Sequence, residues 1–249
     1  MVNKVVIAAA GQGTRMLELS KDRPKHIIEV QKRPFLFYLL DNLYKAGYRD
    51  VVLVLGFKAD LVAKTLGEYC PPGQEEFEIK AVNQYEILGP KEKEYGTACP
   101  LKCVRDLVDD DFIYLNGDNL FSVKDLQLMN VDDGFNYVAG LEHQNPEKYG
   151  VLIQDGGDFL EKIIEKPKEF AGNIINAGLY KFTPEIFEKL PLIKKSPRGE
   201  YEITDVISLL AAEKKVKIKK INDYWVDFGC PHDLEKLEKF ICDGKNNSK

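Results

Sequence analysis

The chain has 249 residues, 44% of them hydrophobic, and a net charge of −5 at pH 7. This length and apolar content suffice for one substantial core. The acidic balance gives no sign of a nucleic-acid-binding surface, so we expect any phosphate groups to meet a few local cations. No apolar run approaches the roughly 20 residues that cross a bilayer. We therefore expect a soluble, cytoplasmic protein that binds neither nucleic acid nor membrane.

The first half of the sequence alternates apolar runs with segments of helical periodicity. Apolar runs predict buried strands at 5–8, 51–56, 79–82 and 112–115, with a short extended piece at 26–30. Helices are predicted to begin at Pro34, Ala59 and Gly96 and to end near Gly47, Tyr69 and Leu107. The charged stretch 86–94, which contains Gly-Pro, is expected to be an exposed loop. This alternation predicts parallel strands joined by right-handed crossovers.

The second half is richer in strands. We predict strands at 136–141, 151–153, 159–164, 174–182 and 216–221, and helices at 184–190, 203–212 and 233–241. No repeat or linker divides the chain, so we predict a single three-layer α/β/α domain over residues 1–243, with a mixed, mostly parallel central sheet. The polar tail 244–249 is expected to fray.

A glycine turn follows the first predicted strand. Gly11 and Gly13 allow a tight turn and let backbone N–H groups approach an anion closely. Arg15 adds a bidentate phosphate donor, and Lys25 after Pro24 is a second cation on a stiffened backbone. A lone Gly-x-Gly is a weak signal, and both the third glycine of a dinucleotide fingerprint and the ending of a Walker A loop are missing. The whole string nevertheless predicts a clamp for a polyphosphate.

Two aspartates that follow predicted strands are candidate metal ligands. Asp118 comes after the run at 112–115, and Asp227 ends the string Trp225-Val226-Asp227. Ligands of an open α/β sheet sit at the carboxyl ends of its strands, which puts Asp118 on the same rim as the glycine turn. Paired carboxylates suit Mg²⁺, which often bridges them to substrate phosphates. An aspartate at such a position is as often a cap or turn residue, and the sequence does not establish that these two meet.

The string from Ala9 to Arg15, with the later Pro24-Lys25, closely resembles the signature A-[AG]-G-x-G-T-R then P-K of the nucleotidyltransferases that activate sugar 1-phosphates. Six further strings match elements of that family in the same order: Gly96-Thr97-Ala98, Leu115–Asp118, Glu165-Lys166-Pro167, Asn176-Ala177-Gly178, Arg198–Asp205 and Trp225–Gly229. Each string is modest alone, but seven in order over most of the chain are highly specific. The chain is thereby identified as a member of this family, with its Rossmann-like, glycosyltransferase-A-like catalytic domain.

The resemblance implies a set of site residues. Nucleotide contacts are implied for Ala9, Ala10, Gly11, Gly13, Thr14, Arg15, Gln84, Gly96 and Asp118, and sugar-phosphate contacts for Gly150, Glu165, Lys166 and Asn176. Arg15, Lys25 and Lys166 take the catalytic roles, and Asp118 and Asp227 hold the cofactor Mg²⁺. The implied reaction is attack of a sugar 1-phosphate on the α-phosphorus of a nucleoside triphosphate, with release of pyrophosphate. The nucleophile is already an anion, so no general base is required.

Several residues match no catalytic pattern. His26, His143 and His232 are expected to be ordinary surface or loop residues, and Trp225 is expected to serve in packing.

The sequence contains no sign of the C-terminal β-helix common in the family, so no fused acetyltransferase is expected.

The sequence also departs from the family near the base pocket. The family's glutamine usually stands a few residues before G-T-A, whereas Gln84 lies further ahead and 86–94 resembles an insertion. Either Asn83 or Gln84 could read the base. UTP or dTTP with a hexose 1-phosphate is favoured. The alternatives are a cytidylyl- or guanylyltransferase with another acceptor, such as heptose 1-phosphate or phosphocholine, and an inactive regulatory relative. A homo-oligomer is left open.

Overall fold

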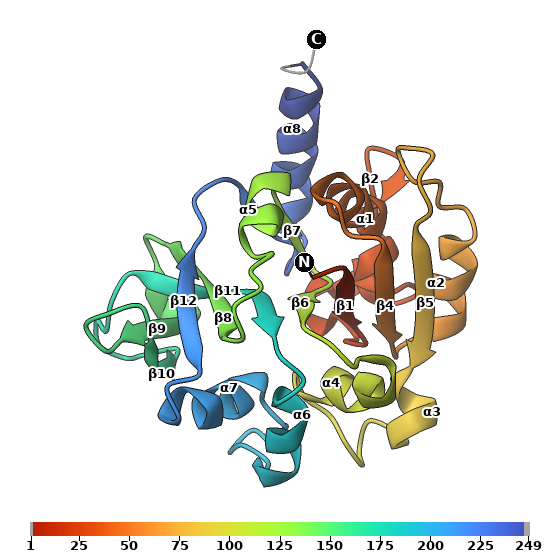
Figure 1. The fold of residues 1–249 in the computed structure, drawn as a ribbon. Coiled ribbons are helices and arrows are strands. Elements are labelled where there is room, and N and C mark those ends of the chain that lie inside the picture. The colour runs from red at the N-terminus through yellow and green to blue at the C-terminus, as the bar shows by residue number, and fades with distance from the viewer. Residues whose placement is uncertain (1, 247–249) are drawn as a thin grey trace.

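The structure is a computed structural model that describes residues 2–246 and arranges them around a nine-stranded mixed sheet (Figure 1). The strand order is β10-β9-β11-β6-β1-β4-β5, and β8 joins β11 to β12. The strands are β1 (Lys4–Ala9), β4 (Asp50–Leu55), β5 (Glu78–Asn83), β6 (Phe112–Asn116), β8 (Asn136–Glu142), β9 (Gly150–Gln154), β10 (Leu160–Glu165), β11 (Ile174–Phe182) and β12 (Val216–Lys220). The predicted mixed, mostly parallel sheet is confirmed.

The parallel half of the sheet has β1 at its centre. Lys4 at the start of β1 is in register with Asp50 of β4 on one side and with Phe112 of β6 on the other. Strand β5 pairs parallel with β4, whereas β11 runs antiparallel to β6. Because β1, β4 and β6 point the same way, the segments that leave their carboxyl ends meet at one rim. This confirms the parallel order predicted from the strand–helix alternation.

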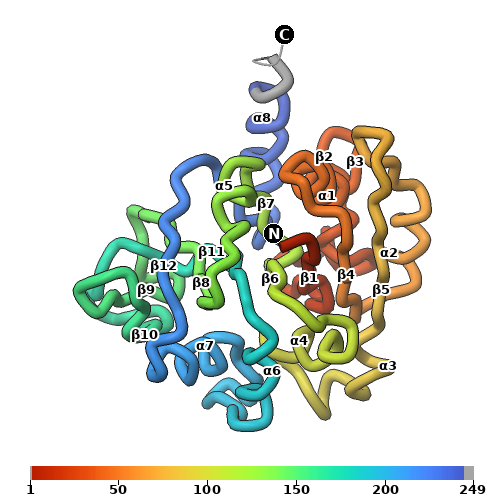
Figure 2. Tube along the Cα trace, viewed as in Figure 1, coloured from red at the N-terminus to blue at the C-terminus, as the bar shows by residue number. Residues whose placement is uncertain are grey.

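Helices cover both faces of the sheet (Figures 1 and 2). Val5 and Ile7 of β1 face a core shared with α1, α2, α5 and α8, whereas Val6 faces a core shared with α4, α6 and α7. This two-residue alternation is the period of a strand buried on both sides. The helices are α1 (Phe35–Ala46), α2 (Ala59–Leu66), α3 (Gln84–Leu88), α4 (Cys99–Val104), α5 (Val123–Leu128), α6 (Ile186–Lys189), α7 (Ile203–Ala212) and α8 (His232–Asn246). Between residues 2 and 246, no helix is both long and apolar enough to cross a membrane.

Three details differ from the sequence prediction. The stretch expected to be a loop begins inside helix α3, because the Asn83 side chain caps that helix by accepting the Tyr85 N–H at 3.0 Å. Strand β7 (Asn119–Phe121) and α5 were not predicted, and β7 pairs with the distant β13 (Trp225–Asp227). The extended piece at 26–30 is a 3₁₀ turn followed by the two-residue strand β2 (Glu29–Val30), which pairs with β3 (Arg33–Pro34).

At the C-terminal end, α8 projects from the rest of the fold (Figure 1). This helix ends at Asn246, within the polar segment 244–249. Residues 247–249 lie outside the described range, so the expected fraying of the tail stays a prediction.

The ammonium group of Lys181 is buried in the core. The side chain of Lys181 in β11 has no exposed surface; its ammonium pairs with Asp111 and donates to the Phe135 carbonyl at 2.9 Å. A buried cation is tolerated only when its partners are complete.

We therefore expect Asp111→Asn to destabilise the protein by about 3 kcal/mol, because it leaves the Lys181 charge without its anion. The double variant Asp111→Asn/Lys181→Met should recover part of this loss, since the uncompensated charge is then absent. Urea unfolding of the wild type and of both variants measures the effect. A double variant less stable than Asp111→Asn alone would contradict this account.

Candidate active site

The glycine turn leaves the carboxyl end of β1 and passes next to Lys25. Gly13 adopts a left-handed conformation (φ 64°), and its carbonyl accepts the Ser20 hydroxyl at 2.8 Å. A Cβ at Gly13 would lie 3.3 Å from the Lys25 side chain, so a glycine suits both the backbone and the close approach. The exposed Arg15 follows on a 3₁₀ turn (Thr14–Ser20). The local sequence thus brings two cations to the end of β1.

Lys25 forms an ion pair with Asp118 at the centre of the rim. Their side chains are 11% and 18% exposed, so solvent screens the pair weakly. The loop that carries Asp118 is tied to β1 by the Gly117 N–H, which donates to the Ala8 carbonyl at 2.9 Å. Burial acts to raise the pKa of Asp118, but the charge and hydrogen bond of Lys25 outweigh it and hold this pKa below its ordinary value. Asp118 is therefore an anion in the free protein.

Asp227 reaches the same rim through the pairing of β13 with β7. Asp227 lies opposite Asn119, whose amide donates to the Asp227 carboxylate at 3.2 Å. The next residue, Phe228, donates its N–H to the Asp118 carbonyl at 2.8 Å. Burial, followed by the negative charge of Asp118, raises the pKa of Asp227 to about 6. The structure thus brings the two predicted metal ligands together.

The two carboxylates fit a divalent cation that takes part of its coordination from elsewhere. Over residues 2–246, no group of three or more His, Cys, Asp or Glu side chains could hold a metal ion. Mg²⁺ commonly takes one or two carboxylates and completes its shell with water and substrate phosphates. The neighbouring carboxylates of Asp118 and Asp227 suit that mode of binding, because a cation would offset the burial and the charge of Asp118 that together raise the pKa of Asp227.

A cavity of about 260 Å³ lies between the glycine turn and α4. Its lining includes six of the nine predicted nucleotide contacts, namely Ala10, Gly11, Arg15, Gln84, Gly96 and Asp118, together with Lys25. The other three, Ala9, Gly13 and Thr14, are not part of the lining; Ala9 is buried inside β1.

Gln84 and Asn83 differ in how free they are to bind a ligand. Gln84 is 1% exposed, and its Oε1 has no partner among the described residues. Asn83 caps α3, and its amide nitrogen donates to Glu86 at 3.0 Å. A buried amide oxygen that faces a cavity is expected to find a donor there. Gln84 is therefore the better placed of the two to contact a ligand.

A second cavity, of about 240 Å³, adjoins the first and shares Arg15, Thr97, Asn116 and Asp118 with it. All four predicted sugar-phosphate contacts line it, namely Gly150, Glu165, Lys166 and Asn176, and so does Asp227. The Lys166 backbone is left-handed (φ 45°), and its N–H donates to the Tyr149 carbonyl at 3.0 Å. The structure thus gathers the two predicted sets in neighbouring hollows.

Asn176 is fixed by its own strand. Its amide nitrogen donates to the Tyr180 hydroxyl at 2.9 Å, and its oxygen accepts the Gly178 N–H at 3.0 Å. Gly178 is left-handed (φ 77°), and a Cβ there would come within 2.5 Å of the Asn116 amide. The string Asn176-Ala177-Gly178 therefore lies at an irregularity of β11, where the register with β8 shifts, and its three residues line the cavity.

The wall shared by the two cavities contains residues whose roles sequence reasoning missed. A Cβ at Gly96 would lie 2.2 Å from the Tyr201 carbonyl oxygen, and Tyr201 bonds to the backbone of both Tyr95 and Ala98. Thr97 accepts the Ile203 N–H at 2.9 Å and lies 3.3 Å from the buried Glu202 carboxylate. The strings at 96–98 and 198–205 were both recognised, but nothing local indicated that they form one wall.

His26 was expected at the surface, and this was wrong. The His26 side chain, directly after Lys25 in the sequence, is 1% exposed. The apolar residues Ile27 and Ile28 that follow it were the sequence signal that could have indicated its burial. Burial, followed by the Lys25 charge, lowers the pKa of His26 to about 3. Its Nδ1 has no hydrogen-bond partner within the described part of the chain.

Trp225, His143 and His232 lie in surroundings closer to those expected from the sequence. Trp225 packs against Tyr149 (5.7 Å between ring centroids), as predicted for a packing residue, and also lines the second cavity. Its indole N–H donates to the Ala177 carbonyl at 3.1 Å. His143 is half-buried against Tyr149, and His232 is exposed.

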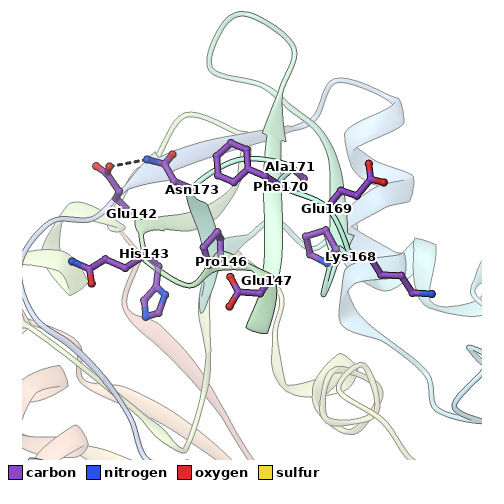
Figure 3. A pocket seen from close by; sticks show the side chains of 11 residues that line it. Glu142, His143, Pro146, Glu147, Lys168, Glu169, Phe170, Ala171 and Asn173 are labelled. Carbon is purple, nitrogen blue, oxygen red and sulfur yellow. Dashed lines mark hydrogen bonds between the residues drawn. The ribbon is translucent and has the colours of Figure 1, made fainter.

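A larger hollow of about 870 Å³ lies outside this site (Figure 3). It separates the segment Glu142–Glu147 from the segment Pro167–Asn173, and a hydrogen bond of 2.7 Å from Asn173 to Glu142 closes one side. None of the predicted site residues lines this hollow, so size alone is a poor guide to the site here.

The fold and the site define an α/β protein whose cations and carboxylates gather at the carboxyl edge of its sheet. The chain belongs to the nucleotidyl transferase family, whose family model matches residues 4–244. It is 32% identical over 241 residues to a bifunctional sugar-1-phosphate nucleotidylyltransferase/acetyltransferase of Sulfurisphaera tokodaii, which covers 96% of this chain. It is 31% identical over 243 residues to the UTP–glucose-1-phosphate uridylyltransferase AglF of Haloferax volcanii, with 95% of both chains covered.

The chain spans 56% of the length of the Sulfurisphaera relative. A solved UDP-glucose pyrophosphorylase in complex with UDP-glucose superposes with a TM-score of 0.79 over 98% of this chain and 100% of that chain. The identity to that protein is 21%, and the likeness shows the shared fold.

The buried His26 predicts an acid-sensitive contribution to stability. In the unfolded chain His26 takes up a proton near its ordinary pKa of 6.5, whereas the folded protein keeps it neutral down to about pH 3. Stability should therefore fall as the pH drops from 6.5, by up to about 1.4 kcal/mol per pH unit from this residue. We expect His26→Gln to flatten this part of the pH profile in urea unfolding. Parallel profiles for the variant and the wild type between pH 7 and 4.5 would contradict the assignment.

Proposed function

We propose that this protein transfers a nucleoside monophosphate from a nucleoside triphosphate to a sugar 1-phosphate and releases pyrophosphate. The observation that carries the proposal is the pair of adjoining cavities that share Arg15 and Asp118. One cavity contains the glycine turn and Gln84, and the other contains Glu165 and Lys166. The names of the Sulfurisphaera and Haloferax relatives support the same reaction, and the latter favours UTP with glucose 1-phosphate.

The arrangement of cations suits a displacement at phosphorus. A phosphate oxygen of the sugar 1-phosphate forms a new bond to the α-phosphorus, and the bond to the bridging oxygen breaks so that pyrophosphate leaves with the electron pair. Arg15 and the turn amides would hold the triphosphate tail, Lys25 the α-phosphate and Lys166 the sugar phosphate. No proton moves in this step, which is consistent with a site that has cations but no exposed histidine base.

Asp118 and Asp227 would hold Mg²⁺, whose charge would offset that of the reacting phosphates. In the free protein Lys25 already neutralises Asp118, so the same ammonium is available to phosphate only when that carboxylate has another cation. Lys25 thereby couples the metal site to the triphosphate site. The need for nucleoside triphosphates is also consistent with a cytoplasmic location.

A pyrophosphate-release assay with coupled pyrophosphatase tests the proposal. UTP, dTTP, CTP, GTP and ATP are crossed with several sugar 1-phosphates and with phosphocholine, with and without Mg²⁺. We expect Mg²⁺-dependent release with one triphosphate and a hexose 1-phosphate. Asp118→Asn and Asp227→Asn should each lower turnover at least about a hundredfold. The exposed Asp223→Asn in the same segment is the control. Turnover only with phosphocholine would show that the acceptor is not a sugar 1-phosphate. The absence of turnover with every pair would favour the alternative that the protein is an inactive relative.

A second experiment separates the two substrate phosphates, because Arg15 lies on the glycine turn and Lys166 beside Glu165. We expect Arg15→Ala mainly to raise the KM for the triphosphate. Lys166→Ala should mainly raise the KM for the sugar phosphate and should also slow turnover. Each effect should be about one to two decades in kcat/KM, since a charge-assisted contact is worth roughly 1.5–3 kcal/mol. Initial rates over a grid of both substrates measure this, with the exposed Lys168→Ala as control. A Lys166 variant altered only in its triphosphate KM would reverse the assignment.

A further inference from the structure

The loop after α3 brings a lysine to the phosphate-binding turn. The Lys91 ammonium donates to Gln12 Oε1 at 3.1 Å, and Gln12 is the middle residue of the turn between Gly11 and Gly13. The same ammonium lies 4.5 Å from the centroid of the Tyr95 ring. Gly11 and Tyr95 both line the first cavity. Lys91 therefore lies next to that cavity, between the glycine turn and the Tyr95 ring.

This loop is held at both ends. At its start the Gly89 N–H donates to the Tyr85 carbonyl at 3.1 Å, and the Lys93 N–H closes a tight turn on Pro90 at 2.9 Å. At its end Glu94 pairs with Lys102 of α4 at 2.8 Å. Lys91 lies inside this short tethered turn, so its reach toward the glycine turn is set by the fold. The stretch is the one that resembles an insertion relative to the family pattern.

The charge of Lys91 is not balanced in the free protein. Among residues 2–246 it makes no ion pair; its partners are a neutral amide and the face of an aromatic ring. Its neighbour Lys102, by contrast, is matched by Glu94. A half-buried ammonium bound only to neutral groups gains more from an anion than a paired one does. The anion expected at the adjacent turn is a polyphosphate.

We propose that Lys91 is a further ligand for the polyphosphate chain of the nucleoside triphosphate, in addition to Arg15. On binding, its ammonium leaves Gln12 and contacts the phosphate oxygens, while the tethered loop stays in place. This inference rests on the proposed function for the identity of the ligand. The group recognised is the phosphate chain and not the base, because the contact that positions Lys91 is with the glycine turn.

Inorganic tripolyphosphate is a probe that has the phosphate chain without a base or sugar. We expect Lys91→Met to weaken the binding of both tripolyphosphate and UTP about tenfold in isothermal titration calorimetry, with Lys91→Arg close to the wild type. Lys93→Met, two residues along the same loop and exposed, is the matched control and should bind as the wild type does. Thermal unfolding checks that all variants are folded.

Equal tripolyphosphate affinity for Lys91→Met and the wild type would overturn the proposal, as would a wild type that binds no tripolyphosphate. A variant weakened toward UTP alone would also overturn it, because Lys91 would then act on the nucleoside. Turnover is measured separately on the wild type. A wild type that binds tripolyphosphate through Lys91 but turns over no substrate pair would refute the proposed reaction and leave the phosphate contact standing.

Discussion

The ion pair between Lys25 and Asp118 is the contact around which the candidate site is built. It joins the segment after the glycine turn to the loop after β6. The glycine turn follows β1, and β1 and β6 are far apart in the sequence but paired in the sheet. Because both side chains are largely buried, the pair fixes the cation and the carboxylate at one point of the rim. Gly13 packs against Lys25 on one side, and Phe228 bonds to the backbone of Asp118 on the other. The pair thereby locks the segment that follows the glycine turn to the loop that carries Asp118.

The two cavities are separate hollows with a common wall, and this wall is rigid for a steric reason. Gly96 lies so close to Tyr201 that no side chain fits between them. Two backbone hydrogen bonds and the buried Glu202 hold the segments together. Four residues line both cavities, so a ligand in either cavity would lie against the same side chains: Arg15, Thr97, Asn116 and Asp118.

Features with a local cause were predictable from the sequence. The run Val5–Ala8 followed by Gly11 and Gly13 identified β1 and its turn, because burial on both faces and a tight turn leave clear marks on adjacent residues. The parallel order followed from the alternation of strands and helices. The family strings contain 20 of the 30 residues that line the two cavities, but they did not indicate that Ala9, Gly13 and Thr14 lie outside the lining.

Features with a distant cause were not predictable. Strand β7 has three residues and exists because β13 pairs with it, so its own sequence is too short to indicate a strand. The approach of Asp227 to Asp118 depends on the same pairing. Which of Asn83 and Gln84 is free to contact a ligand depends on which amide caps helix α3. In each case the deciding partner lies elsewhere in the chain or in a backbone geometry that sequence patterns do not specify.

The pairing of β13 with β7 also has a consequence for the order in which the protein acquires its site during synthesis. The glycine turn, Lys25 and Asp118 belong to the first half of the chain, and their strands can pair before the second half has been made. Asp227 joins them only after the segment through Phe228 has left the ribosome and closed a long loop, which is the slow kind of contact in folding. A nascent chain can therefore present the glycine turn with Lys25 and Asp118 while Asp227 is still missing, and the complete candidate site forms late.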